Sequence, residues 1–417
     1  MDRVMVGVVF GFRKLAGQTS QRVSVNAASQ VTLGDEQTQQ VALPGMIDGR
    51  HPVIDLMGTS YPDACIIFDK ATGLVTAAIR CQTDGWLLTD PALQASRADA
   101  LGLAMKAVAQ MPGVAWVKTH ARTFPVAKSE LMSDAKTISH PVIAQEYSNL
   151  VGNPMLGRIY ARDVIVTITV RKSEVEGEIR GYGGGRQGLG RVMFDRVEQV
   201  GAHLASGGVN MARSYWLGSR ELLAIIKQTY DPSSVEWISE AGGGWPADRP
   251  LALSAAESWF DVRTDEAIHR AWWIEEGPRM EVAAGFLGDL VTTGSFTHTV
   301  TQIFTSRPIW AAEKALADAE GAQQDIERRA KKAGRTLSTE HQASSKALEQ
   351  RRKELVAGHG DVGMVGFVTV SADDEDELAS RIAFLRANAP GMLLNPIKGQ
   401  QYAAFVASML PIGGGVR

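Results

Sequence analysis

A strand–helix–strand order that occurs twice in the first half of the chain constrains the fold most. In the first unit, strands expected at 65–68 and 74–79 flank a turn, and a helix at 92–111 and a strand at 114–119 follow. The second unit has a β-branched strand at 164–170, a helix at 189–206, a strand at 209–216 and a helix at 218–229. This order predicts an α+β fold of tandem ferredoxin-like (split βαβ) units.

The expected helices have periodic apolar faces and recognisable ends. Leu101, Met105 and Val108 recur at helical spacing before Pro112 and Gly113, which end the first helix. A helix expected over 127–150 is broken before Pro141. Near the C-terminus, Asp373 and Asp374 can cap a helix over 374–389, and a further helix is expected over 399–409.

Changes in composition suggest how the chain is divided. We expect an N-terminal extension over 1–60, a first α+β domain over 61–230, a linker or long loop rich in Gly, Pro, Ser and Trp over 231–262, and a second α+β domain over 263–417. The apolar start, residues 5–12, is expected to be a buried strand. The alternative is a membrane-surface segment with Arg13 and Lys14 facing anionic lipid.

Residues 309–357 predict an inserted pair of long antiparallel helices, because Ala, Glu, Lys and Arg dominate and Gly334 marks a turn. The apolar stripe is narrow, which favours a helical hairpin that projects from the second domain as a docking element. The alternative is a hairpin that lies flat along the sheet. The candidate docking residues on this helical hairpin are Trp310, Arg328, Arg329, Lys331 and Lys332.

Two patterns bear on phosphate binding. The sequence contains no Gly-Lys-Ser or Gly-Lys-Thr, so it lacks the phosphate-binding loop of an ATPase. Glycines 183, 185 and 188 form a GxGxxG, but about ten polar residues separate them from the preceding strand, whereas a dinucleotide-binding fold needs a tight turn there. We therefore expect a mobile loop over 173–188, with Arg186 and Arg191 as a candidate anion contact.

No other pattern indicates a reaction centre. The eight histidines form neither an HExxH motif nor a zinc-type Cys/His cluster, so no metal, cofactor or catalytic residue is assigned. The formal net charge of −3 argues against a strongly basic nucleic-acid surface. Cys65 and Cys81 are expected to be buried thiols, and no run of eighteen apolar residues predicts a membrane-spanning helix.

Several stretches resemble a known family. They are residues 269–274 (HRAWWI) with Pro278-Arg279, Phe286-Leu287 and Leu290, then 351–360 (RRKELVAGHG), 366–372 (GFVTVSA), 398–405 (KGQQYAAF) and 410–414 (LPIGG). Together they are similar to the N-terminal, non-ATPase region of CagE/TrbE-type conjugative type IV secretion ATPases. The resemblance is nearest to an actinobacterial conjugative-element family that has this region without a motor domain, and it covers roughly residues 60–417.

This resemblance implies a non-catalytic assembly or docking component of a conjugative DNA or protein transfer apparatus. It implies a cytoplasmic protein at the inner face of the membrane, with a separate motor ATPase and inner-membrane subunits as partners. Homo-oligomerisation stays open. Two alternatives remain: a protein that binds single-stranded nucleic acid through exposed aromatics on a sheet, and an enzyme with an unrecognised site.

Overall fold

The computed structural model describes residues 3–22, 39–44, 50–56, 63–82, 90–153, 157–246, 251–276, 288–292, 294–306, 362–389 and 392–414, with five isolated positions between 317 and 349. The first half contains α1 (Arg3–Leu15), β1 (Ser20–Arg22), β2 (Gln39–Ala42), β3 (Arg50–Asp55), β4 (Cys65–Asp69), β5 (Leu74–Cys81), α3 (Pro91–Ala109), β6 (Val114–Val126), α4 (Lys128–Ala135), α5 (Pro141–Val151), β7 (Ile159–Arg171), η2 (Lys172–Glu174), α6 (Glu176–Gly181) and α7 (Gly185–Ser206).

The second half continues in the same sheet. It contains β8 (Tyr215–Trp216), α8 (Ser219–Tyr230), η3 (Pro232–Ser234), α9 (Val235–Glu240), β9 (Ser254–Glu257), β10 (Val262–Arg263), β11 (Ile268–Glu276), α10 (Gly288–Thr292), β12 (His298–Ser306), β13 (Val362–Ala372), α13 (Glu375–Ala387), β14 (Leu393–Pro396) and α14 (Gln401–Met409). The expected α+β class is confirmed.

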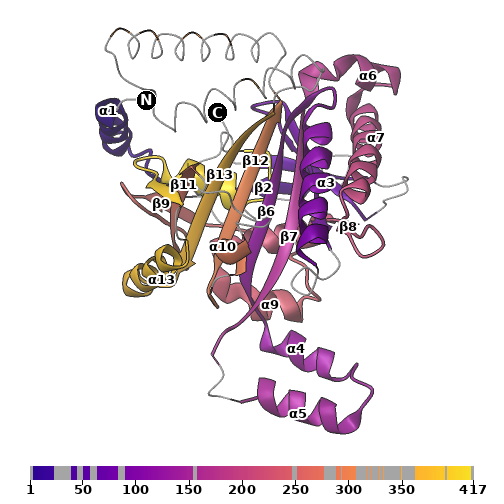
Figure 1. Ribbon diagram of the computed structural model, residues 1–417, viewed down its shortest axis with the longest axis vertical. Helices are drawn as coiled ribbons and strands as arrows, with labels where there is room; N and C mark the ends of the chain where they lie inside the picture. The colour runs from indigo at the N-terminus through magenta and orange to yellow at the C-terminus, as the bar shows by residue number, and fades with distance from the viewer. Residues whose placement is uncertain are drawn as a thin grey trace.

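One antiparallel sheet organises the described residues (Figure 1). Its strand order is β1-β9-β10-β11-β13-β12-β6-β7-β5-β4-β3-β2, with β14 added beside β11 and β8 beside β5. Strands from the two expected α+β domains therefore meet directly where β6 pairs with β12. Residues 231–262, expected to be a linker or long loop, contribute η3, α9 and β9, and β9 is part of this sheet.

Helices cover both faces of the sheet. On one face, Met105 and Val108 of α3 and Val192 and Val197 of α7 are buried against β5, β6 and β7. On the same face, α13 covers β11, β12 and β13. On the opposite face, α8 and α14 pack over the sheet through residues that include Leu222, Ile226, Phe405 and Met409. Most of β6 and one half each of β7 and β13 are thus buried, whereas Val164 of β7 and Met364 of β13 are exposed.

The start of the chain is a correction to the sequence analysis. Residues 5–12 lie in the helix α1, and the expected strand is wrong. The apolar residues Val8, Phe12 and Leu15 recur at the four- and three-residue spacing of a helix rather than alternating. The strand at this end of the sheet is instead β1, which follows α1 and pairs with β9.

A second correction concerns residues 173–188, which are not a loop. They form η2, α6 and the first turn of α7, joined at glycines 183 and 184, which have positive φ angles. Gly188 fits where α7 crosses α6, because a Cβ there would lie 2.3 Å from the carbonyl oxygen of Ile179. The glycine pattern therefore permits close helix packing and a tight turn.

The expected helical hairpin 309–357 lies outside the described residues, apart from Ala317, Gly321, Arg328, Lys332 and Glu349, which are helical and exposed. Cys65 and Cys81 are buried thiols that form no disulfide, as expected, and they belong to apolar clusters on opposite faces of the sheet. Burial raises the pKa of Cys81 to about 12. Among the described residues, no helix is long and apolar enough to cross a membrane.

Candidate docking arm and the cleft at its base

A pair of short helices, α4 and α5, is inserted between the two long strands β6 and β7. Figure 1 shows this pair projecting from the body beyond the ends of these strands. Val126 and Ile159 are the last cross-strand partners before the insertion. His140 precedes Pro141 and is extended, which separates the two helices as the sequence predicted. We call α4 and α5 the arm.

The base of the arm is fixed to the body by Glu236 of α9. Its carboxylate accepts hydrogen bonds from the backbone N–H of Lys128 at 2.8 Å and from the Ser129 hydroxyl at 2.6 Å. The hydrogen bond from Ser129 has the largest effect on the pKa of Glu236. Together these hydrogen bonds lower that pKa, although burial alone would raise it. Helices of 8 and 11 residues are too short to be stable alone, so the arm depends on this anchor and on the contact between α4 and α5.

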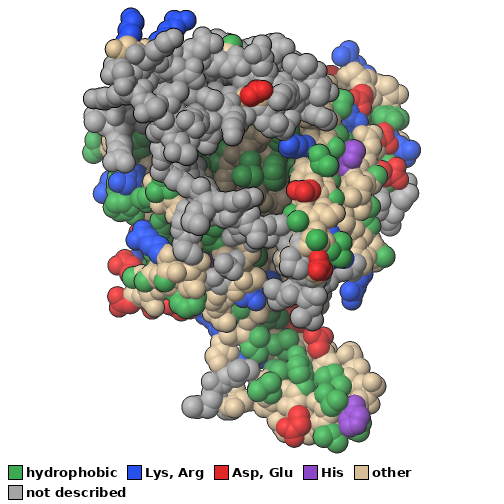
Figure 2. Space-filling model, in the orientation of Figure 1, with side chains coloured by type: hydrophobic (Ala, Val, Ile, Leu, Met, Phe, Trp, Pro, Cys, Tyr) green, Lys and Arg blue, Asp and Glu red, His purple; other side chains and the backbone are tan. Residues whose placement is uncertain are grey.

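The arm exposes large apolar side chains. Val142 is 62% exposed and Leu150 is 60% exposed, and Ile143 and Met132 are also exposed. Hydrophobic side chains gather on the viewed face of the arm in Figure 2. Trp237, on the α9 helix that holds the arm, is exposed as well. Exposed apolar residues that gather on a projecting element are typical of protein contact sites.

A cleft of about 550 Å³ lies at the base of the arm. Its lining comes from α4, the end of β6, α8 and α9, and it includes Arg80, Glu130, Arg220, Glu221 and the glycines 242–244. Phe124, Ala224, Ile225 and Ile238 add apolar surface. Burial raises the pKa of Glu130, and the negative charge of the neighbouring Asp134 raises it further.

A network of charged side chains forms one wall of the cleft and continues beneath it. The Arg80 guanidinium lies 2.6 Å from a Glu221 oxygen and 3.2 Å from an Asp163 oxygen, and it donates to the Tyr215 hydroxyl at 2.9 Å. Asp163 also lies 3.5 Å from Arg122, its direct cross-strand partner. Burial alone would lower the pKa of Arg80, but Asp163 and Glu221 outweigh it and raise that pKa.

A second polar layer is enclosed between the central strands and α14. Lys118 is fully buried and donates to three carbonyl oxygens, those of Ala407 at 3.1 Å, Ile412 at 3.2 Å and Gly414 at 2.9 Å. Burial lowers the pKa of Lys118 to about 7. Next to it, His120 Nδ1 donates to the carbonyl oxygen of Ser408 at 2.9 Å. Burial and the nearby Lys118 lower the pKa of His120 to about 3.

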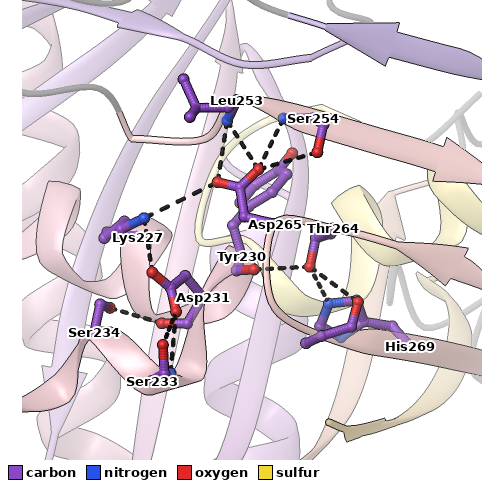
Figure 3. A network of polar contacts seen from close by, with 11 residues as sticks. Lys227, Tyr230, Asp231, Ser233, Ser234, Leu253, Ser254, Thr264, Asp265 and His269 are labelled. Atoms are coloured by element: carbon purple, nitrogen blue, oxygen red, sulfur yellow. Dashed lines mark hydrogen bonds and ion pairs between the residues drawn. The ribbon is translucent and has the colours of Figure 1, made fainter. Parts of the chain in front are cut away.

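The polar contacts in Figure 3 attach α8 to the strands around β9, β10 and β11. Asp265 accepts from the backbone N–H of Ser254 at 2.8 Å and of Leu253 at 3.0 Å, and it lies 4.0 Å from Lys227. The Thr264 hydroxyl donates to the carbonyl oxygen of Tyr230 at 2.7 Å and lies 2.9 Å from His269 Nε2. These contacts are structural because they satisfy backbone groups at the end of α8 and at the start of β9.

The buried position of Lys118 does not suit a reaction centre. Lys118 has a pKa suited to acid–base chemistry, but its ammonium group is enclosed and its three donors are used by backbone carbonyls. In the described ranges, no three His, Cys, Asp or Glu side chains are grouped so as to hold a metal ion.

The structure separates the residues singled out in the sequence. Arg186 lies in the first turn of α7, and Arg191 lies one turn later, where it pairs with Asp195 at 3.9 Å and stacks on Phe194. Trp310, Arg329 and Lys331 lie outside the described residues, and Arg328 and Lys332 are exposed. Sequence reasoning did not single out α4 and α5 as a candidate docking element, nor the alternating polar positions 118, 120 and 122. That alternation was visible in the sequence.

Comparison with known proteins adds no assignment. No family model matches this chain. No curated protein matches it significantly.

Proposed function

We propose that this chain is a non-catalytic assembly component of a conjugative type IV secretion apparatus, and that it docks to its partners through the arm. The observation that carries the docking role is the exposed apolar surface of α4 and α5, held away from the body. The sequence stretches that resemble the non-ATPase region of CagE/TrbE-type proteins supply the setting. Tandem ferredoxin-like units, which meet where β7 pairs with β5 and β6, are part of the same proposal.

The proposed partners are the separate motor ATPase and the inner-membrane subunits of the same apparatus, and the proposed location is the inner face of the cell membrane. The arm suits a protein partner because its exposed residues Val142, Ile143 and Leu150 are apolar and offer little to a phosphate backbone. The lack of a Gly-Lys-Ser or Gly-Lys-Thr loop supports a role without ATP turnover.

The test uses a strain that lacks the gene, complemented with variants of the full chain. Replacing Val142, Ile143 and Leu150 together with Asp should lower transfer frequency and co-purification with the motor ATPase by about tenfold or more, because truncated interface anchors cost on the order of 2 kcal/mol each. The matched control is Leu103→Asp on α3, an equally exposed leucine outside the arm. Equal loss in the control would show that surface charge alone is responsible.

Two further measurements separate the alternatives. ATP turnover that survives repurification, and that a point mutation in this chain abolishes, would make the protein an enzyme. Salt-dependent binding of single-stranded DNA by the purified chain, unchanged in the arm variant, would favour the nucleic-acid-binding alternative. Either result would overturn the proposed docking role.

A further inference from the structure

Helix α1 packs on the body with only one of its faces. Phe10 meets Trp259 edge to face, with ring centroids 5.1 Å apart. Arg13 pairs with Glu257 at 2.7 Å and donates to the carbonyl oxygen of Gly399 at 3.0 Å. A side chain at Gly399 would collide here, since its Cβ would lie 2.8 Å from Trp259. These contacts fix which face of α1 points outward.

The outward face is apolar. Phe12 is 69% exposed and Leu15 is 87% exposed, and Val8 and Val9 are about half exposed. Val8, Phe12 and Leu15 follow one another at helical spacing, so they form one stripe along the outside of the helix. Figure 1 shows α1 at the margin of the molecule, away from α3 and the arm.

The charge of this segment differs in sign from that of the rest of the chain. Residues 1–22 contain four basic residues, Arg3, Arg13, Lys14 and Arg22, and one acidic residue, Asp2, which is a net charge of +3. The whole chain has a net charge of −3, so the remaining residues carry −6. Lys14 is exposed in the last turn of α1, and Arg22 is exposed on β1. An exposed apolar helix face within a basic segment complements an anionic lipid surface.

We propose that α1 is a lipid-contact helix that lies in the headgroup region of an anionic bilayer. Val8, Val9, Phe12 and Leu15 enter the boundary of the acyl chains, and Lys14 meets lipid phosphates. The pairing of Arg13 with Glu257 holds the helix at a fixed angle to the body. This inference rests on the peripheral membrane location proposed above and names the element responsible for it.

Flotation of the full chain with vesicles tests the inference directly. Wild-type protein should bind phosphatidylcholine vesicles that contain about 30 mol% phosphatidylglycerol more tightly than pure phosphatidylcholine vesicles, and high salt should weaken this binding. The double variant Phe12→Asp with Leu15→Asp should bind the anionic vesicles at least about tenfold more weakly than wild-type protein. The Lys14→Glu variant should lose most of the preference for anionic lipid. Leu103→Asp is the control, with an exposed leucine on α3.

Both substituted positions are exposed, so the variants should unfold at the wild-type temperature. The inference is wrong if wild-type protein ignores anionic vesicles or if the double variant binds them equally well. It is also wrong if the double variant only disrupts a dimer in solution, because the face would then join two copies. The docking proposal stands independently of this inference. It holds if the arm variant still lowers transfer, even when wild-type protein does not bind vesicles.

Discussion

Lys118 and Gly414 are 296 positions apart in the sequence, yet the Lys118 ammonium lies 2.9 Å from the carbonyl oxygen of Gly414. The same ammonium holds the carbonyl of Ala407 at the end of α14, where helix carbonyls lack partners and a positive charge is favoured. Gly413 lies so close to the sheet that a Cβ would be 2.5 Å from the Thr76 hydroxyl oxygen. Lys118 therefore attaches the C-terminal segment to the centre of the sheet.

Lys118→Met should change how stability depends on pH. The pKa of Lys118 is about 7 in the folded protein and close to 10.5 when unfolded, so the penalty for its burial is complete below pH 7 and disappears above about pH 10.5. Wild-type stability should rise relative to the variant by up to about 1.4 kcal/mol per pH unit between these values. Urea unfolding of both proteins at pH 7, 8 and 9 measures this difference, and parallel pH profiles would contradict it.

His269→Gln should weaken the loss of stability in acid. His269 contacts Thr264 at 2.9 Å and Ser371 at 2.7 Å, and burial lowers its pKa to about 3. Below the ordinary pKa of histidine, His269 binds a proton in the unfolded chain but not in the folded chain. Stability therefore falls by up to about 1.4 kcal/mol per pH unit from roughly pH 6.5 downward. The variant should be less stable at pH 7 but have a shallower slope between pH 6 and 4. An unchanged slope in denaturant titrations would show that His269 is protonated without unfolding.

Gly188→Ala should destabilise the protein by about 1–3 kcal/mol, because its new methyl group would meet the Ile179 carbonyl oxygen and push α6 away from α7. Gly177→Ala is the matched control in α6, since nothing lies within 4 Å of its Cβ position. The control should raise stability by about 0.4–1 kcal/mol through reduced freedom of the unfolded chain. Thermal unfolding of the two variants should therefore shift in opposite directions, and equal shifts would argue against close packing at Gly188.

Asp163→Asn should cost on the order of 3–5 kcal/mol, since it leaves the buried guanidinium of Arg122 and the partly buried one of Arg80 without their shared carboxylate. Asp373→Asn removes a carboxylate from the exposed pair with Arg158 and should change stability by less than about 1 kcal/mol. Chemical denaturation of both variants compares the two sites. A similar small effect at both would mean that water reaches the network around Asp163.

Local sequence predicted the elements whose ends and faces are set by nearby residues. The side chain of Asp374 accepts from the backbone N–H of Glu377 and begins α13, as expected, and Leu378, Ile382 and Leu385 form its buried face. The turn between β4 and β5 and the break before Pro141 were predicted for the same reason. Caps, turns and proline act over a few residues, so a short stretch of sequence contains them.

Tertiary structure decided the environment of those elements. Lys118, His120 and Arg122 alternate along β6 in a pattern that by itself predicts one face in water, yet α14 covers the first two and replaces water with its carbonyl oxygens. Likewise, the apolar start of the chain is a helix that packs one face against Trp259 and Glu257 and leaves an apolar stripe exposed. Alternation and apolar content determine which side chains share a face, whereas the partner that covers that face comes from segments hundreds of residues away.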